Sequence, residues 1–137
     1  MIKIPGRSSS ASTCSPVLSE QYDEEFFAQH RVLLPAFRAL ADLLWNHMKT
    51  PQHPHPSILD VGCGHGFMVE SLRQCGFTAY GIDGSSSATS LWPVQYLDCY
   101  QVGDLTQTKT LKQFPKTDCI CSFETAEHLP ERVSQRF

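Results

Sequence analysis

The chain has 137 residues, of which 41% are apolar and 18% are charged, with a net charge of −3 and an isoelectric point near 6.0. This is the length of one ordinary domain with enough apolar residues for a core. The slightly acidic balance disfavours nucleic acid as a partner, and the N-terminal residues carry no apolar run long enough for a secretory signal or a membrane span. We therefore expect a soluble protein with no membrane partner.

The N-terminal third of the chain predicts an arm followed by helices. Residues 1–18 are rich in serine, and we expect them to form a disordered arm. Residues 19–50 are expected to form helices, the first beginning at Ser19 as its N-cap and ended or restarted by Pro35. In the next helix, apolar residues recur every three or four positions and predict an amphipathic face packed on a sheet: Phe37, Leu40, Ala41, Leu44, Trp45 and Met48.

A proline-punctuated linker over residues 50–56 keeps the chain extended before the first strand. It contains His53 and His55, which lie between prolines. Two histidines in such a setting are expected to be exposed rather than to bind a metal.

The chain is organised around a glycine loop. The apolar run that begins at Ile58 passes through Asp60 and ends in Gly62, Gly64 and Gly66, and helix-like sequence follows at once. A strand that ends in glycines before a helix N-terminus is typical of a ligand-binding loop in a parallel sheet. Its pattern, Asp-x-Gly-x-Gly-x-Gly, is neither the dinucleotide pattern Gly-x-Gly-x-x-Gly nor a P-loop, which disfavours a nicotinamide cofactor and nucleoside triphosphates.

Three further strands are predicted after the loop. The second ends at Asp83 over residues 78–83, the third lies within residues 98–104, and the fourth covers residues 118–124. A short helix after Ser85 runs toward Trp92, and right-handed crossovers place the linking helices on the faces of a parallel sheet. The sequence therefore predicts an α/β fold with a doubly wound parallel sheet.

Six cysteines occur without a Cys-x-x-Cys pair, which favours reduced thiols and a cytoplasmic location. Cys119 and Cys121 share one face of the predicted fourth strand, where a buried structural role is expected. The full set is Cys14, Cys63, Cys75, Cys99, Cys119 and Cys121.

Four segments together resemble the class I S-adenosylmethionine-dependent methyltransferases. Residues 60–66, 80–84, 103–105 and 122–129 are similar to that family's first four motifs. The resemblance covers about residues 57–130 and implies a Rossmann-like methyltransferase domain with S-adenosyl-L-methionine as cofactor. It does not specify a substrate.

The resemblance also assigns roles to matched positions. The loop glycines would border the methionine moiety of the cofactor, Asp60 its amino group, Asp83 the ribose diol and Asp104 the adenine amine. The expected cofactor-binding set is Asp60, Gly62, Cys63, Gly64, Gly66, Asp83, Gly84, Asp104, Leu105 and Glu124. In this family N-terminal helices also cover the cofactor, so Tyr22 and Phe26 are candidate lid residues.

Candidate catalytic residues cluster just past the fourth strand: Glu124, Glu127 and His128. Methyl transfer is an in-line displacement that depends chiefly on positioning, and a base is needed only if the acceptor must lose a proton. The spacing also resembles the metal-binding segment of small-RNA 2′-O-methyltransferases and quinone-biosynthesis O-methyltransferases, so the same three residues form an alternative metal site. Our primary expectation is that no metal is bound.

The family continues with three more strands in the spatial order 3-2-1-4-5-7-6, whereas residues 51–137 account only for the 3-2-1-4 half. We expect a truncated or naturally short domain whose fourth strand is a bare edge, open to homodimer formation. The favoured function is methyl transfer to a small-molecule acceptor. The alternative is a cofactor-binding domain that needs a dimer or a partner chain for activity, and a metal-assisted RNA or catechol O-methyltransferase is less favoured.

Overall fold

The computed structural model describes Glu25 and residues 29–135. One parallel sheet has the order β3-β2-β1-β4, built from β1 (Ser57–Val61), β2 (Thr78–Asp83), β3 (Tyr100–Val102) and β4 (Cys119–Cys121). Strand β1 pairs with both β2 and β4, and β2 pairs with β3. The expected strand order 3-2-1-4 is confirmed.

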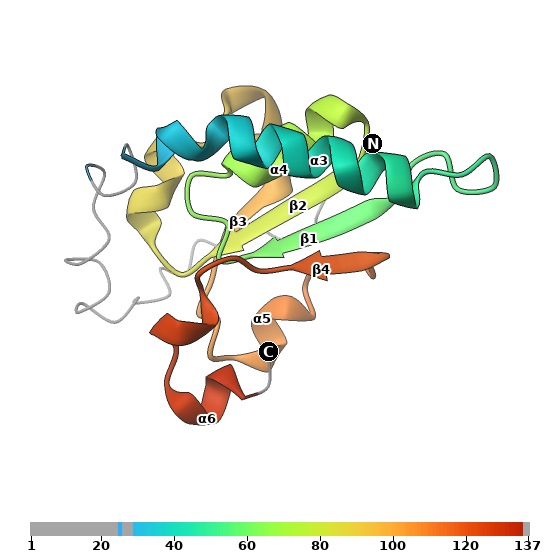
Figure 1. Cartoon of the computed structure of the whole chain (residues 1–137). Coiled ribbons are helices and arrows are strands. Elements are labelled where there is room, and N and C mark those ends of the chain that lie inside the picture. The colour runs from blue at the N-terminus through green and yellow to red at the C-terminus, as the bar shows by residue number, and fades with distance from the viewer. Residues whose placement is uncertain (1–24, 26–28, 136–137) are drawn as a thin grey trace.

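Helices lie on both faces of the sheet, as a doubly wound fold requires. Figure 1 shows α3 and α4 on one face and α5 and α6 on the other. The helices are η1 (His30–Leu33), α3 (Leu34–Met48), α4 (Phe67–Cys75), η2 (Ser86–Leu91), η3 (Val94–Cys99), α5 (Thr108–Leu111), η4 (Ala126–His128) and α6 (Glu131–Ser134). Within the described part of the chain, no helix is long and apolar enough to cross a membrane.

The apolar face of α3 is confirmed, although its main partner differs from the expectation. Ala41 is fully buried, and the other five residues of the stripe are partly buried against the core. The helix packs chiefly on α4 rather than on the sheet, because α4 already lies over the central strands. The Trp45 ring also meets the Phe77 ring edge-on, with centroids 5.1 Å apart. Pro35 lies in the first turn of α3, where η1 gives way to the α-helix, and the expected helix start at Ser19 lies outside the described residues.

Strands β3 and β4 are shorter than expected, and side chains contribute hydrogen bonds at both ends of β4. Before β4, the Asp118 carboxylate accepts hydrogen bonds from the Ser57 N–H (2.7 Å) and hydroxyl (2.6 Å). After β4, the Ser122 hydroxyl donates to the Val61 carbonyl at 2.8 Å. Glu124 then adopts a φ of 49°, a left-handed conformation that ends an extended strand.

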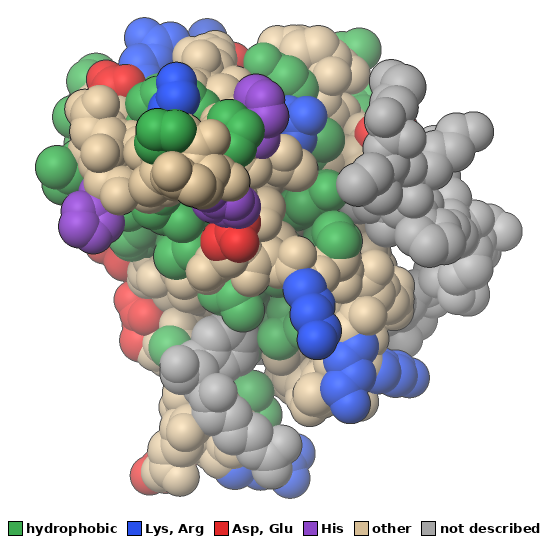
Figure 2. Space-filling view, turned by 90° about the vertical axis from the view of Figure 1, so that its right-hand side faces the viewer, with side chains coloured by type: hydrophobic (Ala, Val, Ile, Leu, Met, Phe, Trp, Pro, Cys, Tyr) green, Lys and Arg blue, Asp and Glu red, His purple; other side chains and the backbone are tan. Residues whose placement is uncertain are grey.

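The linker before β1 is held to the start of β4. The His53 Nε2 lies 2.9 Å from the Asp118 carboxylate, and both side chains are nearly half exposed. Hydrogen bonds from Ser57 and His53 lower the pKa of Asp118 to about 2. Figure 2 views this side of the molecule, where several histidine side chains gather and one lies beside an acidic side chain. His53 is exposed, as expected, and its contact with Asp118 joins the linker to β4.

Candidate functional site

The loop between β1 and α4 has the backbone that its glycines predict. Gly62, Gly64 and Gly66 all have positive φ, at 80°, 50° and 76°, a region that glycine enters at no steric cost. The Gly62 N–H donates to the Ile82 carbonyl at 2.8 Å, which holds the loop against the end of β2. The alternate glycines are therefore needed for the turn itself.

Two of these glycines also make room for protein side chains, which the sequence did not reveal. A Cβ at Gly62 would overlap the Thr125 side chain, and one at Gly66 would overlap the Tyr100 ring. The Tyr100 hydroxyl donates to the Gly66 carbonyl at 3.0 Å. The space that a Gly66 side chain would need is thus filled by Tyr100.

We expect Gly66→Ala to lower the free energy of unfolding by about 2 kcal/mol, because positive φ and overlap with a buried ring are both unfavourable. Chemical denaturation would measure the change. The matched control is Gly84→Ala, since a Cβ there meets only the Gly103 carbonyl at 3.9 Å. Equal losses in the two variants would contradict the packing role of Gly66.

Trp92 supports the same loop from the segment after β2. Its indole N–H donates to the Gly64 carbonyl at 2.7 Å, and its ring stacks on Tyr100 with centroids 4.8 Å apart and planes 16° from parallel. Both rings are buried. The serine-rich sequence around Trp92 carries no periodic signal for this role, so the sequence predicted only a helix end there.

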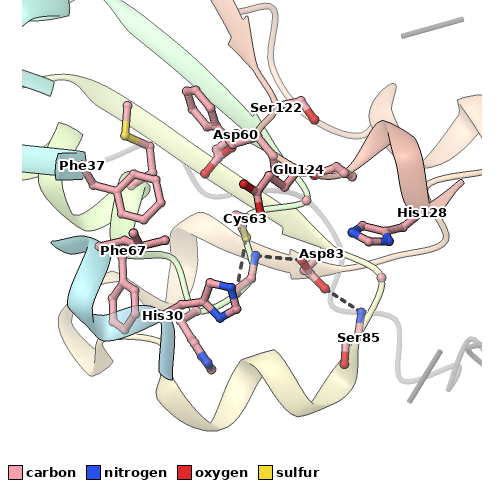
Figure 3. A pocket seen from close by; sticks show the side chains of 18 of the residues that line it. His30, Phe37, Asp60, Cys63, Phe67, Asp83, Ser85, Ser122, Glu124 and His128 are labelled. Carbon is pink, nitrogen blue, oxygen red and sulfur yellow. Dashed lines mark hydrogen bonds between the residues drawn. The ribbon is translucent and has the colours of Figure 1, made fainter. Parts of the chain in front are cut away.

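A cavity of about 510 Å³ opens beside the glycine loop, at the carboxyl ends of the strands (Figure 3). Parallel sheets commonly bind ligands at this edge. The lining residues come from η1, α3, the end of β1, the glycine loop, the start of α4, the end of β2 and the segments after β2, β3 and β4. They are His30, Leu33, Ala36, Phe37, Asp60, Gly62, Cys63, Gly64, His65, Phe67, Met68, Asp83, Gly84, Ser85, Leu105, Ser122, Phe123, Glu124, Thr125, His128 and Leu129.

Most of the residues expected from the sequence meet in this cavity. Asp60, Gly62, Cys63, Gly64, Asp83, Gly84, Leu105, Glu124 and His128 line it. Gly66, Asp104 and Glu127 are not among the described lining residues. The Asp104 carboxylate instead accepts hydrogen bonds from the Thr106 hydroxyl (2.6 Å) and N–H (2.9 Å). The bond from the hydroxyl is the main cause of a lowered pKa at Asp104. Asp104 therefore caps its own turn.

Asp83 joins the ends of two strands. One carboxylate oxygen accepts the Gly64 N–H at 2.7 Å, and the other accepts the Ser85 N–H at 2.8 Å. Burial raises the pKa of Asp83, while these backbone hydrogen bonds oppose the rise. The geometry fixes the carboxylate in the cavity wall next to the glycine loop.

Asp60 is the most deeply buried acid of the site, at 3% exposure. Burial raises its pKa to about 7, and the nearby Asp83 charge adds to the rise, whereas a hydrogen bond from Cys121 opposes it. The Cys121 thiol lies 3.6 Å from the carboxylate. A cationic ligand group facing Asp60 would favour its ionised form.

The alternative metal site is not assembled. Glu124 and His128 line the cavity, but Glu127 does not. Among the residues that the structure describes, no group of three or more histidine, cysteine, aspartate or glutamate side chains could hold a metal ion. The candidate lid residues Tyr22 and Phe26 lie outside the described residues.

The sequence missed the apolar side of the cavity. Leu33 and Phe37 come from the N-terminal helices, Phe67 from the start of α4, and Phe123 from the segment after β4. The rings of Phe37 and Phe123 meet edge-on, with centroids 6.4 Å apart. No local pattern links residues this far apart in the chain, so only the fold shows that they form one surface.

Comparison with known proteins agrees with the fold. A family model described as a methyltransferase domain matches residues 28–134. The magnesium protoporphyrin IX methyltransferase of Synechocystis PCC 6803, solved with bound S-adenosylmethionine, superposes with a TM-score of 0.63 at 16% identity, covering 86% of this chain and 65% of that one. At that identity the likeness concerns the fold alone.

Curated relatives that match part of the chain bear the name ubiquinone biosynthesis O-methyltransferase. The protein of Actinobacillus pleuropneumoniae is 29% identical over 86 residues, covering 56% of this chain and 36% of its own length. That of Haemophilus ducreyi is 31% identical over 85 residues, with the same coverage of 56% and 36%. The chain thus spans about a third of the length of the curated relatives it matches.

Proposed function

Because the chain belongs to the class I S-adenosylmethionine-dependent methyltransferases, its cofactor is S-adenosylmethionine, and we propose that it transfers a methyl group to a small-molecule acceptor. The observation that carries this proposal is the cavity in which the glycine loop, Asp60 and Asp83 meet. The two carboxyl groups and the loop backbone can form hydrogen bonds with a ligand that carries hydroxyl and ammonium groups.

The residues present fit this cofactor. Asp60 is a buried carboxylate without a lysine or arginine among the described residues that line the cavity, so an ammonium group would complement it. Asp83 is held rigidly by two backbone N–H groups and has acceptor capacity left for a diol. We assign Asp60 to the amino group and Asp83 to the ribose, with Gly62, Cys63, Gly64, Gly84 and Leu105 as the remaining cofactor contacts.

When bound, the cofactor supplies an electrophilic methyl group on a sulfonium. The protein's contribution is then to hold an acceptor atom in line with that methyl, to exclude water and, if required, to remove a proton. Glu124 and His128 line the cavity just past β4 and are the residues we assign to contact the acceptor. Glu127 and Asp104 lie elsewhere, so we assign neither a direct role.

The backbone conformation of Glu124 favours a functional role for its side chain. It is the sole non-glycine residue with positive φ in the described part of the chain, and strained residues of this kind gather at functional sites. We expect Glu124→Gly to leave the free energy of unfolding unchanged or to raise it by up to about 1 kcal/mol, while methyl transfer falls about tenfold or more.

Thermal denaturation and a single-turnover methyl transfer assay measure the two effects. Glu127→Gly is the comparison, since its backbone has no positive φ to relieve and stability should fall. A Glu124→Gly protein that is less stable and equally active would contradict this role.

The alternative is a cofactor-binding domain with little activity alone. Among the residues that the structure describes, strand β4 has a neighbouring strand on one side only, and Ile120 on it is 64% exposed. A second copy pairing along this edge, as the homodimer hypothesis holds, would cover that side chain. Specific activity that rises with protein concentration favours this alternative. Specific activity that does not depend on protein concentration favours a chain that transfers methyl groups by itself.

The first test is a calorimetric titration of the purified chain with S-adenosylhomocysteine, with light scattering to give the mass. We expect one site per chain with micromolar affinity. A folded protein that shows no binding would overturn the proposed function. The five described cysteines are free thiols, which supports a cytosolic location, and the titration is therefore run under reducing conditions.

A further inference from the structure

The cavity has two chemically different sides. Figure 3 shows Phe37 and Phe67 on one side, and Asp83, Ser85 and His128 on the opposite side. The cofactor contacts proposed above do not include the large apolar residues of the lining, Leu33, Phe37, Phe67 and Phe123. The apolar side is therefore left for another molecule.

The apolar side is open enough to receive a ligand. Phe123 is 42% exposed and Leu33 is 41% exposed, although both line the cavity together with Phe37. Large apolar side chains exposed around a concavity mark binding surfaces more often than large side chains scattered singly. The edge-on contact between the Phe37 and Phe123 rings, with centroids 6.4 Å apart, presents ring faces and edges to the cavity rather than polar atoms.

The charges of the lining decide what kind of molecule fits. Asp60, Asp83 and Glu124 are acidic, and no lysine or arginine lines the cavity among the residues that the structure describes. Phosphate, sulfonate and carboxylate groups are bound chiefly by such cations or by backbone N–H groups. The N–H of Gly64, which such a group could have used, already donates to Asp83.

We propose that the methyl acceptor is an uncharged, apolar aromatic compound whose ring packs against Phe37 and Phe123. This inference rests on the proposed function. Aromatic rings pack favourably edge-on or offset against such a pair. An anionic group on the same ring would lie in a cavity whose described lining includes Glu124 and no lysine or arginine. Phe37 and Phe123 are then specificity-determining residues, and nucleotides or phosphorylated compounds are poor acceptors.

The test compares three probes that differ in one property each: naphthol, naphthol sulfonate and decahydronaphthol. Each is titrated calorimetrically into the protein saturated with S-adenosylhomocysteine, and again into the protein alone. We expect naphthol to bind roughly tenfold more tightly than naphthol sulfonate, and several-fold more tightly than the non-aromatic decahydronaphthol.

Phe123→Ala and Phe37→Leu test the surface itself. We expect Phe123→Ala to weaken naphthol binding about tenfold and Phe37→Leu, a smaller change, to weaken it several-fold. The matched control is Leu43→Ala, which removes an apolar side chain of α3 that is 66% exposed and is not part of the cavity lining. Leu43→Ala should leave naphthol binding unchanged.

The outcomes separate this inference from the proposed function. If S-adenosylhomocysteine binds but naphthol does not, or if naphthol sulfonate binds as tightly as naphthol, the acceptor class is wrong while the cofactor assignment stands. If S-adenosylhomocysteine fails to bind a folded chain, the proposed function is wrong, and naphthol binding to the protein alone still decides whether the apolar side is a ring-binding surface. Equal naphthol affinities in the wild type and both phenylalanine variants would show that Phe37 and Phe123 do not bind the ring.

Discussion

Asp83→Ala is expected to weaken the binding of S-adenosylhomocysteine at least ~100-fold, because hydrogen bonds to charged groups contribute about 1.5–3 kcal/mol each. The carboxylate lines the cavity and also accepts the Gly64 and Ser85 N–H groups. Its removal therefore takes away a ligand contact and one of the hydrogen bonds that hold the glycine loop to the end of β2. Calorimetric titration measures the change in affinity.

Two further variants separate these effects. Asp98→Ala removes an exposed acid outside the cavity lining and should leave the affinity unchanged. Asp83→Asn keeps the shape of the side chain but offers one acceptor oxygen, so it should fold and still bind more weakly than the wild type. Retention of full affinity in Asp83→Ala would contradict the role of this carboxylate.

The second prediction concerns Asp60 and pH. In the folded chain burial raises its pKa to about 7, whereas an unfolded aspartate titrates near ~4. Between these values the folded state binds more protons than the unfolded state, so the contribution of Asp60 to stability falls as pH rises, by about 1.4 kcal/mol per pH unit. The contribution present below pH ~4 is lost by the time the pH has passed about 7.

The wild type alone would not display this slope, because His65 acts in the opposite direction. Burial, with a smaller effect from His30, lowers the pKa of His65 to about 4, so its contribution to stability rises with pH up to its unfolded value near ~6.5. The difference between the wild type and Asp60→Asn isolates the carboxylate. Urea unfolding of both proteins at pH values of about 5 and about 8 should show the wild type losing about 2–3 kcal/mol relative to Asp60→Asn.

The same group links cofactor binding to protons. An ammonium group facing Asp60 favours the ionised carboxylate, so binding near neutral pH should release protons. Titrations of S-adenosylhomocysteine in buffers of different ionisation enthalpy would detect the release, and Asp60→Asn should abolish it. A difference in unfolding free energy that stays constant with pH, together with no proton release, would show that Asp60 is ionised throughout.

The family resemblance implied the strand order. The sequence by itself determined the parallel sheet, the glycine loop, and the positions of Asp60 and Asp83 at the carboxyl ends of strands. These follow from local patterns: apolar runs with the length of strands, glycines at alternate positions where φ turns positive, and crossovers with one favoured hand. Residues within such motifs reach the same edge of a parallel sheet whatever the rest of the chain does. The spacing of the motifs was therefore enough to place the polar side of the cavity.

Only the tertiary structure decided which side chains complete the site. Trp92 and Tyr100 donate hydrogen bonds to the glycine loop, and Phe37 and Phe123 pack together on the apolar side of the cavity. Both pairs depend on contacts between segments far apart in the chain. Asp104 and Glu127 occupy motif positions and yet are not among the described residues that line the cavity, since the rotation of a short turn or helix decides where a side chain points. Periodicity records which face of an element is apolar, whereas the partner of that face depends on how the elements pack.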